Sequence, residues 1–274
     1  NGRGRSLWKK SDGSGRSLMV HVLLLSVQPS CARGGARNLS EDSRNADAEA
    51  NRTYAPTGRT VVLGVGSDSS DKHLRVYIAG HAAKFRSKAV VLLYDASGWN
   101  ERGHGIFRVA DQLAANGFVV AMADHFRGLD WAPGQSPPAS TGTVREDLLD
   151  TLMPYLEDEY EASVVGLMGL GWGGQHALRL ASAREHLGAV VVVDGASLEV
   201  EAAVQARVPV AVYAAGEGPS VALLRGALSR APAASSCEVS TFAGRSPGFV
   251  VGDWSDGDVA TDAAEALNRT NAFF

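Results

Sequence analysis

The sequence predicts an α/β domain built on a doubly wound, mostly parallel sheet of about seven or eight strands, with helices on both faces. Strand-like apolar segments alternate with helical segments along most of the chain. Several strand segments are unbroken runs of Val, Leu and Ala rather than alternating patterns. Such runs are typical of parallel strands that crossover helices cover on both faces.

The expected strands lie at 60–65, 74–79, 89–94, 118–123, 163–168, 189–194, 208–214 and 237–242. The expected helices lie at 106–116, 144–160, 175–187, 220–229 and 259–273. Gly117 is placed to end the first helix, and apolar residues recur at helical spacing through the second. Residues 131–141, rich in Pro and Gly, interrupt this order as an irregular surface loop or a pocket cover.

Composition places the chain among single-domain globular proteins with an N-terminal extension. It has 274 residues, 45% hydrophobic residues and a formal net charge of -4. Basic residues beyond Arg59 are scattered among acids, which argues against a nucleic-acid partner. Cys31 and Cys237 are too few for a disulfide framework or a cysteine metal site, and no clustered His or Asp spacing indicates a metal. We therefore expect no cofactor.

Residues 1–59 are expected to precede the folded domain, which spans 60–274. A basic stretch, an apolar run at 18–27 and the small residues 30–32 predict a secretory or organelle-targeting leader within residues 1–32. The alternative is an amphipathic tail that targets nothing, in a soluble cytoplasmic protein. The run is shorter than the ~18 apolar residues that a membrane span needs, so we expect no stable span. Residues 33–59 hold almost no large apolar side chain and are predicted to be a disordered linker.

The sequence Gly-Leu-Gly-Trp-Gly-Gly at 169–174 falls where a strand turns into a helix. A G-x-S-x-G or G-x-C-x-G turn at such a place holds a catalytic nucleophile at its third position. That position is Gly171, which offers no reactive atom but adopts the turn's backbone without steric cost. The same letters spell G-x-G-x-x-G, a dinucleotide-binding pattern.

From about residue 74 to residue 274 the chain resembles the dienelactone hydrolase family of the α/β-hydrolase fold. The segments that carry the resemblance are 89–100 (AVVLLYDASGWN), 110–120 (ADQLAANGFVV), 123–128 (ADHFRG) and the turn 169–174, which in many members reads G-F-C-W-G-G. Residues 209–210, 216–217, 247–249 and 272–274 are similar to later landmarks. The order and spacing of these segments are specific, although no single one is diagnostic.

The resemblance implies a Cys or Ser nucleophile, an Asp after a late strand and a His after the last strand. By position these three roles fall on Gly171, Gly218 and Pro247, none of which can perform them. The loss of all three predicts a catalytically impaired pseudoenzyme.

The resemblance also implies a pocket that remains. The backbone N–H groups of Ala96 and Trp172 are expected to form an oxyanion hole, which does not depend on side chains. Arg127 lies near a substrate-binding arginine of the family and is a candidate for an anionic group. We therefore expect a small carbonyl or carboxylate ligand, or a protein partner.

Two alternatives stay open at this point. A rebuilt ester or lactone hydrolase site can draw on side chains predicted at strand ends and in the oxyanion loop, which are Asp95, Ser97, His104, Asp124, His125 and His176. A dinucleotide site is the second alternative, because Asp194 ends the next strand where a ribose-binding acid belongs. Against it, several strands precede the pattern, and the family's own turn generates it once Gly replaces Cys.

Overall fold

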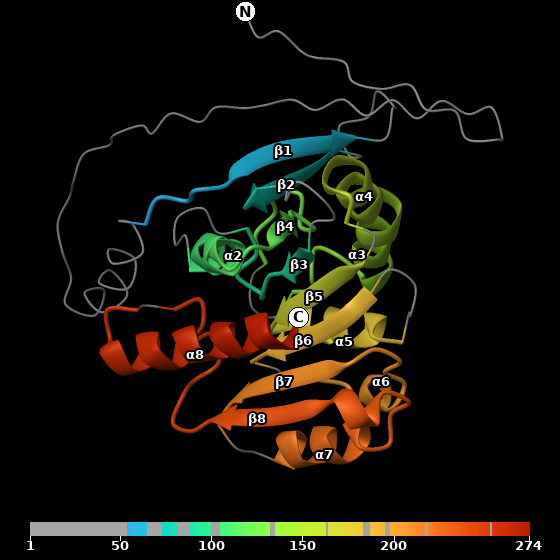
Figure 1. The fold of residues 1–274 in the computed structure, drawn as a ribbon, viewed down its shortest axis with the longest axis vertical. Coiled ribbons are helices and arrows are strands. Elements are labelled where there is room, and N and C mark those ends of the chain that lie inside the picture. The colour runs from blue at the N-terminus through green and yellow to red at the C-terminus, as the bar shows by residue number, and fades with distance from the viewer. Residues whose placement is uncertain are drawn as a thin grey trace, which may run out of the picture.

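The computed structural model describes residues 54–64, 73–81, 88–99, 105–131, 135–162, 164–182, 187–194, 198–216, 219–252 and 254–274. Within them an eight-stranded sheet runs in the order β1-β2-β4-β3-β5-β6-β7-β8. β1 and β2 are antiparallel to each other, β2 is antiparallel to β4, and all later neighbours are parallel. The predicted doubly wound, mostly parallel α/β sheet is confirmed (Figure 1).

The strands are β1 Arg59–Gly64, β2 His73–Ala79, β3 Ala89–Leu93, β4 Val119–Ala123, β5 Val165–Leu170, β6 Leu187–Val193, β7 Val210–Ala215 and β8 Glu238–Phe242. Every residue of β3 and β4 is buried, as the unbroken apolar runs indicated.

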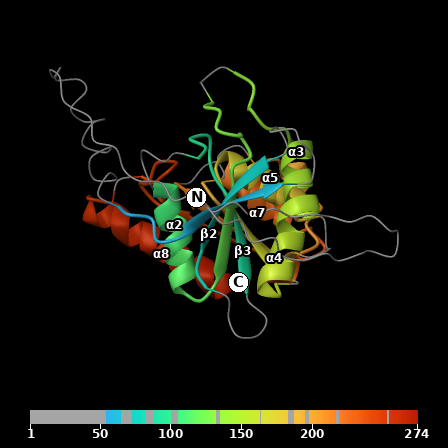
Figure 2. The same cartoon turned by 90° about the horizontal axis from the view of Figure 1, so that it is seen from above.

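Helices cover both faces of the sheet (Figure 2). One face carries α2 Gly105–Ala115 and α8 Gly257–Phe273, which contact each other. The other face carries α3 Thr141–Glu146, α4 Met153–Tyr160, α5 Trp172–Leu180, α6 Val200–Val204 and α7 Pro219–Leu228. The short helices α6 and η3 Ala234–Ser236 were not expected from the sequence. A helix of this length leaves no periodic apolar stripe to detect.

The expected helix 144–160 differs from the observed one in two ways. It begins earlier, at Thr141, because the Ser140 hydroxyl accepts a hydrogen bond from the Thr143 N–H at 3.1 Å and caps the helix. Its middle, η2 Asp147–Leu152, is a π-helical segment between α3 and α4. Such segments redirect side chains and are frequent at functional sites.

The turn after β5 also differs from expectation. The strand was expected to stop at Met168, but Gly169 and Leu170 still pair with Val192 and Val193 of β6. Because the strand runs two residues further, the reversal is made at Gly171 alone. Helix α5 ends at Leu180, whereas the sequence predicts that it continues to residue 187. Leu187 instead belongs to β6.

The described chain begins ahead of the expected domain boundary. Residues 54–58 lie in the segment predicted as linker, yet the Tyr54 hydroxyl and the Thr57 N–H both donate to Asp111 of α2, at 2.6 and 2.8 Å. These residues are held by a buried carboxylate that the linker's composition does not reveal. The predicted leader and the rest of the linker lie outside the described residues.

Asp111 also accepts a 2.6 Å hydrogen bond from the Tyr77 hydroxyl of β2. We predict that Tyr77→Phe lowers the free energy of unfolding by about 1–3 kcal/mol, because it leaves a buried carboxylate short of a donor. Urea unfolding measures this loss.

Tyr54→Phe provides the second arm of a double-mutant cycle, since both hydroxyls donate to the same carboxylate. We expect the two losses to be non-additive. Losses that add to within about 0.5 kcal/mol would contradict a shared site.

Candidate functional site

The turn after β5 has the backbone of a nucleophile elbow. Gly171 lies at φ 45° and ψ -109°, a region that L-residues enter only with strain. A Cβ placed on Gly171 would lie 3.2 Å from the Asp95 Cβ, which is tight but open to a small adjustment. The turn thus has a strained backbone at Gly171, with room beside it for a small side chain.

The neighbouring glycines serve close packing. A Cβ on Gly173 would lie 2.4 Å from the Leu93 carbonyl oxygen, and one on Gly169 would lie 2.5 Å from the Gly173 carbonyl oxygen. A Cβ on Gly174 would lie 2.6 Å from a methyl carbon of Val192. All three are contacts that real Cβ atoms do not make. Helix α5 thus begins directly against β3, β5 and β6 only because these positions lack side chains.

The loop after β3 lies beside the elbow. The Gly173 N–H donates to the Tyr94 carbonyl at 3.0 Å, which ties the first turn of α5 to this loop. The Asp95 carboxylate accepts from the Ser97 N–H at 2.9 Å and thereby shapes the turn through Ala96. Ala96 is exposed, so its N–H lies near solvent at the edge of the elbow.

Aromatic side chains form one wall of the elbow. The Trp172 ring lies 4.8 Å from Phe126, 5.9 Å from Tyr94 and 6.5 Å from Trp131, measured between ring centroids. Trp131, at the start of the irregular loop, therefore packs against the elbow. The Tyr94 hydroxyl accepts from the Phe126 N–H at 2.8 Å, and the Trp131 indole N–H donates to the Gln135 carbonyl at 2.9 Å.

A buried ion network stands behind this wall. Asp147, placed by the π-helical segment, accepts from His125 Nδ1 at 2.8 Å and from both terminal nitrogens of Arg127 at 3.0 and 2.6 Å. Burial acts to raise the pKa of Asp147, but the hydrogen bonds from His125 and Arg127 outweigh it and the pKa is lowered. Arg127 is thus held by Asp147 and does not present a free guanidinium to an anionic ligand.

His176 of α5 is also buried against the wall. Its ring lies 4.3 Å from Trp172, and neither ring nitrogen has a hydrogen-bond partner within the described residues. Burial, with the charge of Arg179, lowers the pKa of His176 to about 4. His176 is therefore neutral at pH 7.

Asp194, at the end of β6, turns inward. It is 7% exposed and has a left-handed backbone at φ 61°. Its Oδ2 accepts from the Gly248 N–H at 2.7 Å, whereas its Oδ1 is buried and has no hydrogen-bond partner among the described residues. Burial raises the pKa of Asp194 to about 7, with a further contribution from the charge of Asp95.

The remaining predicted positions are dispersed or lie outside the described residues. Pro247 is exposed in the loop after β8, and Ser97 is exposed with no imidazole bonded to it in the described part of the chain. Asp124 is buried and bonded to Arg75. Gly218 and His104 lie outside the described residues.

The sequence analysis assigned no function to Asp147. Asp147 follows Val144 and precedes Leu148, two buried residues on the same helical stripe. A charged residue on an apolar stripe signals a buried partner, and this signal was available. Asp194 was considered only for ribose binding, because its partner Gly248 is 54 residues away in the chain.

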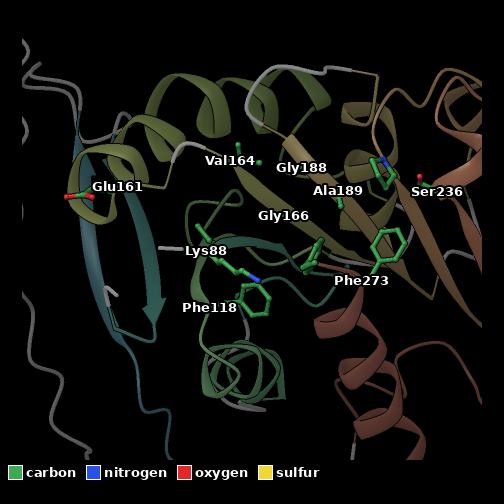
Figure 3. A pocket seen from close by; sticks show the side chains of 12 residues that line it. Lys88, Phe118, Glu161, Val164, Gly166, Gly188, Ala189, Ser236 and Phe273 are labelled. Carbon is green, nitrogen blue, oxygen red and sulfur yellow. The ribbon is translucent and has the colours of Figure 1, made fainter. Parts of the chain in front are cut away.

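A cavity of about 640 Å³ lies at the opposite edge of the sheet, at the amino ends of the strands. Figure 3 shows Lys88 beside Phe118 on one side and Phe273 on another, with Gly166 and Gly188 between. None of the predicted site residues lines it.

Two further findings concern the described residues alone. They contain no group of three or more His, Cys, Asp or Glu side chains arranged to hold a metal. None of their helices has the length and apolar character to cross a bilayer.

Residues 74–274 match the sequence model of the dienelactone hydrolase family. A carboxymethylenebutenolidase homolog of Mus musculus is 25% identical over 203 residues, which are 68% of this chain and 80% of that protein. The protein of the same name from Rattus norvegicus is 25% identical over a stretch that covers 40% of this chain and 47% of that protein. A crystal structure from Klebsiella pneumoniae, provisionally assigned as a dienelactone hydrolase, has a TM-score of 0.63 at 19% identity. The superposition covers 79% of this chain and 98% of that one. It shows a shared fold.

We predict that Gly173→Ala lowers the free energy of unfolding by about 3 kcal/mol, because backbone atoms of β3 cannot move away from the new methyl group. Urea unfolding measures the loss. The matched control is Gly257→Ala at the start of α8, where a Cβ meets nothing within 4 Å. We expect it to stay within about 1 kcal/mol of the wild type. Equal effects of the two variants would contradict the packing role of Gly173.

The low pKa of His176 predicts a loss of stability on acidification. The folded value is about 4, below the ~6.5 of an unfolded histidine. The unfolded chain therefore binds more protons between these values, and stability falls as pH drops through that window.

We expect the wild type to lose on the order of 2 kcal/mol more than His176→Leu between these two pH values. Urea unfolding at a series of pH values measures the difference. Parallel stability profiles for the two proteins would show that His176 does not titrate in this way.

Proposed function

The chain belongs to the dienelactone hydrolase family, and from this premise we propose that it binds a small carbonyl compound at its elbow without hydrolysing it. Gly171 carries this proposal, because it has the elbow backbone and no nucleophilic atom. A covalent acyl intermediate needs such an atom. Pro247, where the resemblance places the histidine, supplies no base.

The carbonyl oxygen binds to the N–H groups of Ala96 and Trp172. The first N–H lies in the loop after β3 and the second opens α5, where the helix dipole favours partial negative charge. Both donors belong to the backbone and survive the loss of the side chains. The aromatic wall around Trp172 supplies apolar contact for the rest of the ligand.

The ligand is a neutral carbonyl compound in preference to a carboxylate. Arg127 was the candidate for an anionic group, and both of its terminal nitrogens donate to Asp147. Asp95 and Asp194 add negative charge beside the elbow, which disfavours an anion.

The two alternatives have less support. A rebuilt hydrolase needs a base bonded to Ser97, and the described residues offer none. A dinucleotide site needs free N–H groups at the start of α5, but those of Gly171 and Gly173 donate to the carbonyls of Val193 and Tyr94. Asp194 faces inward toward Gly248 and not toward a ribose.

We expect the wild type to show no turnover of p-nitrophenyl acetate above buffer and no labelling by a fluorophosphonate probe. Gly171→Ser combined with Pro247→His returns a hydroxyl and an imidazole to the family positions, and we expect this variant to gain the label. Mass spectrometry of the labelled protein identifies the modified residue.

Wild-type turnover that disappears in Ser97→Ala or His125→Ala would contradict the proposal. Such a result would establish a rebuilt hydrolase in its place.

A further inference from the structure

Two carboxylates flank the empty nucleophile position. The Asp95 Cβ lies where a Cβ on Gly171 would nearly touch it, at 3.2 Å. On the other side the Gly171 N–H donates to the Val193 carbonyl at 3.1 Å, and Asp194 is the next residue. Asp95 and Asp194 are close enough for the charge of one to act on the other. They follow different strands, β3 and β6, and both lie beside Gly171.

Within the part of the chain that the structure describes, no cation bonds to either carboxylate. The two arginines on this side of the sheet, Arg75 and Arg127, are held by Asp124 and Asp147. Within the described residues Asp95 accepts only from the Ser97 N–H, and Asp194 only from the Gly248 N–H. A buried carboxylate without a cation is costly when ionised. The energetic cost of keeping Asp194 buried without a cation indicates that this carboxylate has a functional role.

Asp194 is buried and Asp95 is half-buried, so the pair has an inner and an outer member. The buried Oδ1 of Asp194 has no partner, which leaves one oxygen able to hold a proton. Asp95 is the member that a ligand at Gly171 meets. An outer carboxylate can accept a proton from a bound ligand, and such transfer needs no nucleophile.

We propose that Asp95 and Asp194 form a proton-transfer pair, in which Asp95 removes the α-proton of a neutral carbonyl compound bound at the elbow and Asp194 is a positioning residue that modulates it. The inference rests on the proposed function, because the N–H groups of Ala96 and Trp172 must hold the carbonyl oxygen. It adds an activity, carbon-acid proton exchange or isomerisation. The substrate class is ketones and unsaturated lactones with an acidic α C–H.

The step is balanced without any further reactant. The bond between the α-carbon and its hydrogen breaks, and the proton goes to an Asp95 carboxylate oxygen. The electron pair forms a carbon–carbon double bond, and the carbonyl oxygen becomes an enolate oxygen that the two N–H groups stabilise. The return of a proton to the same carbon gives exchange with solvent. Its return to the far end of a conjugated enolate gives an isomer.

Asp194 sets the pH dependence of this activity. The groups around Asp194 are the Asp95 carboxylate, the Gly248 N–H and the Tyr213 carbonyl, which accepts from the Asp194 N–H. Among the described residues, Asp95 is the charged group that acts on Asp194. As pH rises through the Asp194 pKa of about 7, Asp194 becomes negatively charged, and this charge favours the transfer of a proton from a bound ligand into the site. We therefore expect exchange to accelerate across this pH.

The test uses α-angelica lactone in D2O, followed by proton NMR. Deprotonation at its α-carbon leads to deuterium at that carbon or to the conjugated β isomer, whereas hydrolysis gives levulinate. We expect the full chain to accelerate deuteration or isomerisation over buffer and to form no additional levulinate.

Asp95→Asn should reduce the rate by about 100-fold or more. Asp194→Asn should keep the exchange activity but lose the increase in rate near pH 7. The control variant Asp158→Asn, on the exposed face of α4, should match the wild type.

Each outcome separates the two proposals. Lactone that saturably changes tryptophan fluorescence but is not deuterated overturns this inference and leaves the proposed function standing. Levulinate formed above buffer overturns the proposed function. Wild-type exchange in Asp95→Asn, or an unchanged pH profile in Asp194→Asn, also overturns the inference.

A measurement on the wild type and Asp95→Asn covers the case in which Asp194→Asn fails to fold. Carbon-13 NMR of the Asp194 carboxyl group should show a lower pKa in Asp95→Asn, because one negative neighbour is gone. An unchanged titration would overturn the pairing.

Discussion

The close approach of helix α5 to the ends of β3 and β5 is the constraint on which the rest of the site depends. Gly169, Gly173 and Gly174 permit it, because side chains at these positions would overlap backbone or packed side-chain atoms. The N–H of Gly173 then bonds to the Tyr94 carbonyl, which places the loop after β3 alongside the start of the helix. Every group at the elbow takes its position from this contact, and so the elbow keeps its form without a nucleophile.

Charge around the elbow is arranged in two groups. Asp124 and Asp147 hold Arg75 and Arg127, and these pairs fasten the segments after β4 to their neighbours. Asp95 and Asp194 have no such cation and lie nearer the elbow glycine. A buried ion pair mainly maintains structure, whereas a buried carboxylate without a cation changes its protonation state more readily. This division separates the groups that hold the site from those available to act in it.

The elements with unbroken apolar runs were predictable, because burial on both faces leaves a clear pattern in the sequence. The ends of these strands were harder to predict. Glycine usually marks a turn, but β5 continues through Gly169 because this residue pairs with Val192 of β6. The π-helical segment was invisible, because α-helical and π-helical spacing look alike in a short sequence. The sequence analysis therefore assigned no role to Asp147, although its position among buried residues indicated one.

By itself the sequence determined the fold class, the family and the absence of a nucleophile at Gly171, because these depend on residue types and their local order. Only the tertiary structure decided which carboxylates lie beside the elbow. Three strands and their connecting helices separate Asp95 from Asp194 in the chain, yet parallel strands bring their carboxyl ends to one edge of the sheet. It also decided that Arg127 is occupied by Asp147. Pairings of this kind arise from long-range packing, which no local pattern encodes.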